Sequence, residues 1–267
     1  MAEPNPIAWW RRLLALPNES RGKMLAMAFL VAAVSSLTVS IAAVVLQPQI
    51  DANKAAERQA KLDAMIADLP GLADILAETG ADTLETIIVD LTTGLVAEAA
   101  FEAFDFAAIA ADPETSTELS DDQDIAGIIR RPNYAEIHVL KAGRQVELVI
   151  LPIYAAGYQS TIRAFLALRG DLNTVAGLVV TEQGETPGLG ANIATPAWQA
   201  LWPGKKLADD DGTLKLAVVR GQGTTEYEVD GITGATRTST AVGDMIAFWM
   251  GPNGYAKVFE ALRTGAL

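Results

Sequence analysis

The sequence predicts an α+β protein in which one N-terminal transmembrane helix precedes an extracytoplasmic domain with an antiparallel sheet and flanking helices. Three observations predict this fold: a long uncharged apolar run, a later series of short β-branched runs, and helical patterns between and after them. We divide the chain into a cytoplasmic N-terminus (1–23), a transmembrane helix (24–46), a helical connector (47–85) and the folded domain (86–267).

The composition excludes several classes of protein. Half of the 267 residues are hydrophobic and 20% are charged, which argues against intrinsic disorder. The formal net charge of -13 repels a phosphate backbone, so we expect no nucleic-acid partner. The absence of cysteine excludes disulfides, Cys-ligated zinc, iron–sulfur clusters and thiol nucleophiles, and the single histidine leaves few options for a metal site or a Ser-His-Asp triad. We therefore expect no metal and no catalytic side chain.

Residues 24–46 form a run without a charged side chain. As a helix this run would reach roughly 34 Å, which is enough to cross a hydrocarbon core of about 30 Å. A cleaved signal peptide is the alternative, and Ser40 with Ala42 could supply its cleavage site. The length disfavours it, because the apolar core of a signal peptide usually spans only about 7 to 15 residues. We therefore expect a retained anchor.

Basic side chains gather before this run. They outnumber the acidic ones there by two, so the rest of the chain carries a charge of -15. Lys and Arg close to a membrane end are retained on the cytoplasmic side, which predicts a cytoplasmic N-terminus and an exported main domain. The basic residues are Arg11, Arg12, Arg21 and Lys23, and the acidic ones are Glu3 and Glu19.

Local patterns after the anchor predict a helix and then a sheet. Residues 47–69 are rich in Ala, Lys, Glu and Gln, with apolar residues at helical spacing, and Pro70 and Gly71 should end that helix. Six β-branched runs separated by Gly, Pro and Asp then predict antiparallel strands, and helical patterns interleave with them near 196–202 and 239–249. The six runs are 86–91, 134–140, 144–154, 161–168, 174–182 and 214–220.

The most informative stretch is DGITGATRTS at 230–239, between a strand-like run and an apolar helix. Gly231 and Gly234 permit a sharp turn and a close approach of a ligand to the backbone. The small Ala235 leaves Thr236 unobstructed. Thr and Ser ahead of a helix supply N-cap oxygens, and the free N–H groups there favour an anion such as phosphate. Taken alone, the stretch is a turn with a capping threonine.

This string resembles the flavinylation motif Asp-x-x-(Ser/Thr)-Gly-Ala-Thr of covalent FMN-binding domains. Five residues match it in register: Asp230, Thr233, Gly234, Ala235 and Thr236. The resemblance implies that a separate flavin transferase cleaves FAD and joins FMN through its phosphate to the Thr236 hydroxyl. It implies that Asp230 positions the loop or helps the transferase to engage. Since the metal and the general base belong to the transferase, a chain without cysteine can still host redox chemistry.

A second segment, ETPGLG at 185–190, strengthens the resemblance. It is a Pro-Gly turn after a strand, and its glycines would let the backbone approach a flat ring. In the family such a segment lines the flavin, and the lysine of WPGKKL matches a lysine position there. The residues that the resemblance implies as ring or ribityl contacts are Glu185, Thr186, Leu189, Gly190 and Lys205.

Within these domains the chain is most similar to the C subunits of sodium-translocating NADH:quinone oxidoreductases. PNESRGK, ETPGLG, WPGKK, VDGITGATRTS and FWMGPNGY carry this likeness. It implies a flavoprotein of the bacterial inner membrane, with its main domain in the periplasm, that relays electrons from NADH toward ubiquinone together with other membrane subunits while the complex exports sodium. Two alternatives stay open: the G subunit of an Rnf-type ferredoxin:NAD oxidoreductase, and an assembly or scaffold subunit without a redox flavin.

Other conspicuous residues have structural interpretations. His138 stands in an alternating run without partners for a metal site, so we expect a structural role. Trp198, Trp202 and Trp249 are predicted as core or interface anchors. The acidic stretch 105–124 is interpreted as a solvated surface loop, because its scattered carboxylates lack the spacing of a sodium site.

Overall fold

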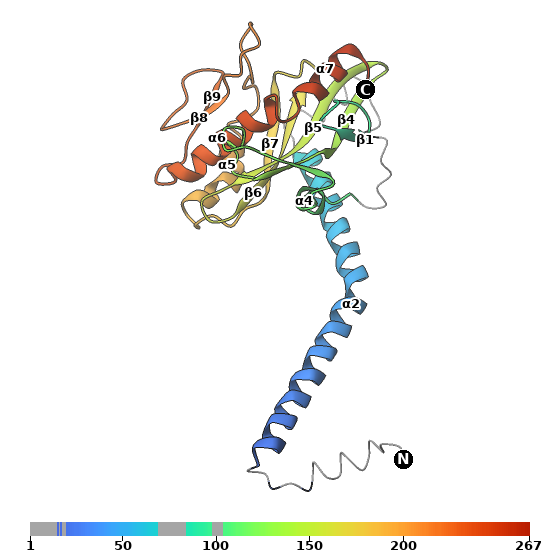
Figure 1. Cartoon of the computed structure of the whole chain (residues 1–267). Helices are drawn as coiled ribbons and strands as arrows, with labels where there is room; N and C mark the ends of the chain where they lie inside the picture. The colour runs from blue at the N-terminus through green and yellow to red at the C-terminus, as the bar shows by residue number, and fades with distance from the viewer. Residues whose placement is uncertain (1–14, 16, 18–19, 69–83, 98–103) are drawn as a thin grey trace. The chain divides into compact units, whose positions relative to one another are not determined.

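The computed structural model describes residues 15, 17, 20–68, 84–97 and 104–267, and the chain divides into two compact units, 1–62 and 63–267. The long helix α2 (Arg21–Asp68) makes up most of the described part of the first unit (Figure 1).

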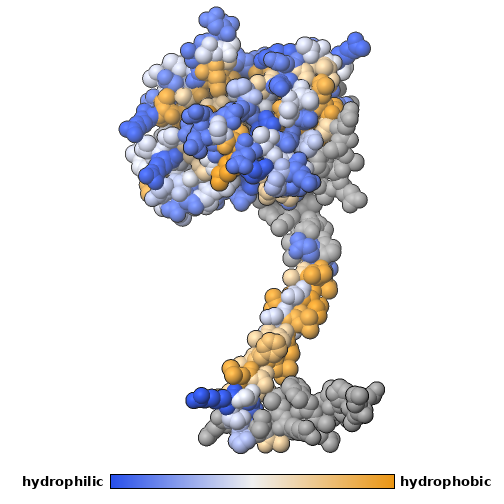
Figure 2. Space-filling view, viewed as in Figure 1, coloured by the Kyte–Doolittle hydropathy of each residue, from blue (hydrophilic) through white to orange (hydrophobic). Residues whose placement is uncertain are grey.

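The N-terminal part of α2 is apolar. Its segment Arg21–Gln47 has a mean hydropathy of 2.4 and none of its most apolar window is buried. Figure 2 shows apolar side chains covering this part of the helix. By length and composition the segment can cross a membrane. The helix continues through the predicted connector as far as Asp68, and the predicted stop at Pro70 lies outside the described residues.

A five-stranded antiparallel sheet forms the centre of the second unit, with strand order β1-β4-β5-β6-β7 (Figure 1). This confirms the predicted α+β class with its antiparallel sheet, because each strand coincides with one of the β-branched runs. On β5, alternate residues such as Val149, Leu151 and Ile153 enter the main core. The strands are β1 (Leu84–Asp90), β4 (Tyr134–Ala142), β5 (Gln145–Ala156), β6 (Thr161–Arg169) and β7 (Val175–Glu182).

Two C-terminal helices, α6 (Thr236–Met250) and α7 (Ala256–Thr264), complete the core. The indole of Trp249, at the end of α6, donates to the carbonyl of Tyr154 on β5 at 2.7 Å. The phenol of Tyr255 donates to the carbonyl of Pro152 at 2.7 Å. Trp198, Trp202 and Trp249 are all buried, which confirms them as core anchors. These bonds fix the C-terminal end of α6 to β5 and so set where its first residue lies.

The predicted place of run 214–220 in the antiparallel sheet is wrong. Only β8 (Ala217–Val219) is a strand, and it pairs in parallel with β9 (Glu228–Asp230), apart from the main sheet. The first half of the run bonds to Leu207 instead of to a strand of the main sheet: the Leu207 carbonyl accepts from the N–H groups of both Lys215 and Leu216. The predicted helix near 196–202 is a short one, α5 (Pro196–Gln199), preceded by the 3-10 helix η1 (Gly190–Ala194).

The acidic stretch 105–124 is more ordered than a solvated loop. It contains α4 (Phe106–Ala111) and β2 (Ser116–Glu118), and β2 pairs with β3 (Arg130–Pro132). The ring of Phe106 lies 5.2 Å from that of Tyr154 and 5.7 Å from that of Trp249. The loop interpretation is therefore wrong for these elements, because one partly buried aromatic ring packs against the core and anchors a segment whose other residues are mostly polar.

His138 has the expected structural role. It is 4% exposed on β4, and its Nδ1 lies 3.0 Å from the hydroxyl of Thr86 on β1. Burial lowers the pKa of the imidazole to about 4, so the folded protein keeps it neutral.

We expect this histidine to make the protein less stable in acid. Between its ordinary pKa near 6.5 and the folded value of about 4, the unfolded chain binds the extra proton. The free energy of unfolding should therefore fall as the pH drops through this window, by about 3 kcal/mol at most. Urea unfolding of the full chain in detergent, at neutral pH and near pH 4, would measure the loss. His138→Gln should show a smaller loss, and an equal loss in both proteins would contradict the assignment.

Candidate functional site

The motif at 230–239 folds as the end of β9, a turn and the first turn of α6. Gly234 has a φ of +82°, which suits glycine, and Ala235 is the N-cap. Thr236 is the first helical residue, so the predicted role of a threonine as cap is wrong. An alanine cap has no side-chain oxygen, and no side-chain cap bond is formed. The first-turn N–H groups of α6 therefore remain suited to an external acceptor.

Four hydrogen bonds fix this turn. The N–H of Ile232 donates to the hydroxyl of Ser239 at 2.9 Å. Asp230 bonds on two sides: its carboxylate accepts from the N–H of Gly223 at 2.8 Å, and its carbonyl accepts from the indole of Trp198 at 2.8 Å. The N–H of Gly231 donates to a carbonyl on β8 at 2.7 Å. Thr236 itself is exposed. The bonds thus hold the backbone while the threonine hydroxyl stays accessible.

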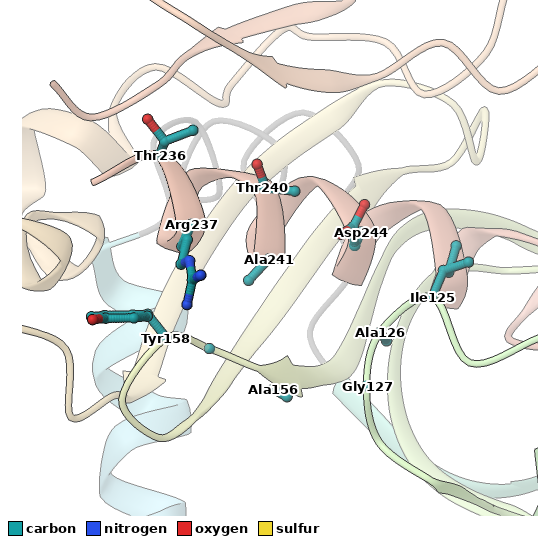
Figure 3. Close-up of a pocket in the computed structure, with 11 residues that line it drawn as sticks. Ile125, Ala126, Gly127, Ala156, Tyr158, Thr236, Arg237, Thr240, Ala241 and Asp244 are labelled. Carbon is teal, nitrogen blue, oxygen red and sulfur yellow. The ribbon is translucent and has the colours of Figure 1, made fainter. Parts of the chain in front are cut away.

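A cavity of about 340 Å³ lies beside Thr236 (Figure 3). One wall is the face of α6 on which Thr236, Thr240 and Asp244 recur every four residues. The turn after β5 and the loop 125–127 line it as well. The lining residues are Ile125, Ala126, Gly127, Ala156, Gly157, Tyr158, Thr236, Arg237, Thr240, Ala241 and Asp244.

Among these lining residues, two carry a formal charge. The guanidinium carbon of Arg237 lies 5.3 Å from the ring centroid of Tyr158. Burial raises the pKa of Asp244, which lies further along α6. The cavity therefore combines hydroxyls, a cation against an aromatic ring, and a carboxyl whose charged form is disfavoured.

Glu185 connects the first turn of α6 to the turn after β5. It is 4% exposed, and one carboxylate oxygen accepts from the hydroxyl of Thr238 in the first turn of α6 at 2.5 Å. The other oxygen accepts from the N–H of Gln159 at 2.9 Å, beside Tyr158. The structure therefore gives Glu185 two protein partners, and a direct contact with flavin stays a prediction.

The rest of segment 185–190 lies against the motif turn. Gly190 is buried, and a β-carbon at this position would lie 2.5 Å from the Thr238 hydroxyl. A β-carbon on Gly234 would lie 3.1 Å from a methyl group of Leu189, which is 43% exposed. Thr186 is exposed on the same turn. The two predicted flavin segments are thus neighbours in the fold.

Lys205 does not line the Thr236 cavity. Its ammonium group donates to the carbonyl of Thr225 at 3.0 Å, on the loop before β9. Sequence reasoning missed several lining residues. The four-residue spacing from Thr236 could have identified Thr240 and Asp244. No local pattern marks 125–127, which reaches the cavity through a bond from the N–H of Ala156 to the carbonyl of Ala126.

Comparisons with known proteins identify relatives of this chain. The FMN-binding domain family matches residues 157–251, from the turn that carries Tyr158 to the end of α6. The C subunit of the Na(+)-translocating NADH-quinone reductase of Vibrio anguillarum is 35% identical over 258 residues, which cover 95% of this chain and 100% of that protein. The same subunit of Pseudomonas aeruginosa is 37% identical over 257 residues, which cover 93% and 98%.

A solved structure has the same fold. The crystal structure of NqrC from Shewanella oneidensis superposes with a TM-score of 0.64 at 34% sequence identity, over 72% of this chain and 88% of that one.

Proposed function

Because this chain belongs to the family of Na(+)-translocating NADH-quinone reductase C subunits, we propose that its FMN is joined by a phosphoester to Thr236. The chain is a flavoprotein subunit of that oxidoreductase complex and works with its other subunits. Family membership favours this role over the G subunit of an Rnf-type complex. The observation that carries the proposal is the exposed Thr236 hydroxyl at the uncapped start of α6, next to a cavity.

The residues present fit an FMN phosphate and part of the molecule beyond it. The free N–H groups of the first turn and the helix dipole favour an anion at Thr236. The cavity of about 340 Å³ falls within the range of roughly 300–1,000 Å³ typical of small-molecule sites. Tyr158 gives it an aromatic wall. When bound, FMN supplies one- and two-electron redox chemistry that none of these side chains offers.

The chain's own residues then have separate tasks. Thr236 provides the oxygen that a flavin transferase joins to the phosphate, and the start of α6 holds the phosphate oxygens. Asp230, through Gly223 and Trp198, holds the turn in place for the transferase. A covalent link also keeps the flavin at a high effective concentration, which an exported domain needs because free FMN is not retained around it.

We further propose that Arg21–Gln47 crosses the inner membrane, with the N-terminus in the cytoplasm and the folded domain in the periplasm. As a helix this segment measures roughly 40 Å, so it spans the core with some tilt. Because the chain has no cysteine, a single Asp211→Cys can be labelled selectively. Labelling by a membrane-impermeant reagent in intact spheroplasts supports the orientation, and labelling only after lysis contradicts it.

Intact mass spectrometry of the full chain tests the attachment. The chain is produced in a host with and without a flavin transferase, and the denatured band is examined for flavin fluorescence. A mass increment of one FMN, with fluorescence that depends on the transferase, is the expected result. A chain of unmodified mass in the transferase-positive host would leave a scaffold role without a redox flavin.

A further inference from the structure

We propose that Arg237 is the electrostatic group that raises the reduction potential of the bound flavin. The proposal rests on the attachment of FMN to Thr236 described above. It concerns the residue that directly follows the motif, and it follows from where the guanidinium lies and from what surrounds it.

The guanidinium occupies the cavity without being aimed at the attachment atom. Arg237 follows Thr236 directly and lines the same cavity. Figure 3 shows the Thr236 hydroxyl and the Arg237 side chain on different sides of α6, with Arg237 turned toward Tyr158. The ring of Tyr158 lies 5.3 Å from the guanidinium carbon and favours this position of the cation. Because both residues line the cavity, a group that is tied to Thr236 and extends into this cavity would meet the positive charge of Arg237.

Among the described residues, few carboxylates lie near the Arg237 guanidinium to neutralise its charge. In the described part of the chain, no carboxylate lies within 4.0 Å of the Arg237 guanidinium. Asp244 is the other charged lining residue, and it lies seven residues along α6, which is about 10 Å of helix. Elsewhere the molecule is acidic, with a net charge of -13. Arg237 is therefore the cation placed to interact with a negative charge in the cavity.

Reduction of a flavin creates such a charge. Uptake of two electrons and one proton converts the neutral oxidised ring into a reduced ring with one additional negative charge. The electrons come from NADH through the complex, and the proton comes from solvent. A fixed positive charge stabilises the reduced form more than the oxidised form, so it raises the reduction potential.

Redox titration of the full flavinylated chain tests this assignment, using wild type, Arg237→Gln, Arg237→Lys and Arg144→Gln. Arg237→Gln should shift the midpoint potential to more negative values, so that at a fixed potential the ratio of reduced to oxidised flavin falls roughly three- to tenfold. Arg237→Lys keeps the charge and should restore most of the potential. Arg144→Gln removes an equal charge at the start of β5, roughly 36 Å along the strand from the end that lines the cavity. Its midpoint potential should match that of wild type.

The order of measurement separates this inference from the proposed function. Intact mass is recorded first, and a wild-type chain without FMN would remove the proposed function and this inference together. With FMN present in all four chains, an unchanged potential in Arg237→Gln overturns the role of Arg237 alone. The role of Arg237 is also overturned if Arg237→Gln lowers the potential and Arg237→Lys fails to restore it. The difference in potential between wild type and Arg237→Gln should shrink in about 1 M salt, because screening weakens a charge effect, and an unchanged difference overturns the role as well.

Discussion

Replacing Thr236 with alanine should abolish the covalent flavin while the domain stays folded. The substitution removes the oxygen that the proposed phosphoester requires. The side chain is exposed and stands at the first position of α6, so the free energy of unfolding should change by less than about 0.5 kcal/mol. Intact mass and fluorescence of the denatured band measure attachment, and near-ultraviolet circular dichroism checks the fold.

Three variants serve as controls for this result. Thr236→Ser keeps a hydroxyl and should retain FMN, whereas Thr240→Ala changes the next exposed threonine on the same face and should leave attachment intact. Thr238→Val removes a buried hydroxyl that donates to Glu185, so it should cost stability without removing FMN. A mass increment that persists in Thr236→Ala contradicts the assignment. Its loss in a folded Thr238→Val chain would move the attachment by two residues.

The variant Gly190→Ala should destabilise the domain by about 1–3 kcal/mol and reduce the extent of flavin attachment. The added methyl group would lie 2.5 Å from the Thr238 hydroxyl and 2.9 Å from a Glu185 carboxylate oxygen. It therefore pushes the first turn of α6, which carries Thr236, away from segment 185–190, a displacement that removing the Thr238 hydroxyl does not cause. Urea unfolding of the full chain in detergent and intact mass measure the two effects.

A methyl group added elsewhere on α6 provides the matched control. Gly243→Ala places its β-carbon 3.7 Å from the nearest atom, an ordinary contact, and should be neutral or stabilising in the helix. If the collision with Thr238 causes the loss of stability and of flavin attachment in Gly190→Ala, the double variant Gly190→Ala/Thr238→Ala should recover part of both. Wild-type stability and full attachment in Gly190→Ala would show that the first turn tolerates the displacement.

The strands of the main sheet could be predicted because their pattern is local. Alternation such as Val149, Leu151 and Ile153 appears within a few residues. The run 214–220 looked similar, but its place depends on Leu207, whose carbonyl takes two of its N–H groups. The start of α6 was predicted three residues late, because Ala235 as N-cap carries none of the side-chain oxygens that usually mark a helix start.

The site was only partly predictable, because only part of it is marked by a local sequence pattern. A contiguous string marks Thr236, so its exposed position at a helix start could be predicted. The bond between Glu185 and Thr238 joins residues 53 apart in sequence, and neither residue type announces the pairing. The charges of 105–124 likewise obscured Phe106, whose ring contacts become evident only once β5 and α6 are placed.

The carboxylate of Glu185 also couples two segments mechanically. One oxygen holds the first turn of α6, and the other holds the backbone amide of Gln159. That amide can exchange its hydrogen with solvent only when the bond to the carboxylate opens. Its exchange rate therefore measures how firmly the fold holds the first turn of α6, where we propose that FMN is attached, and it can be measured without any optical signal from the flavin.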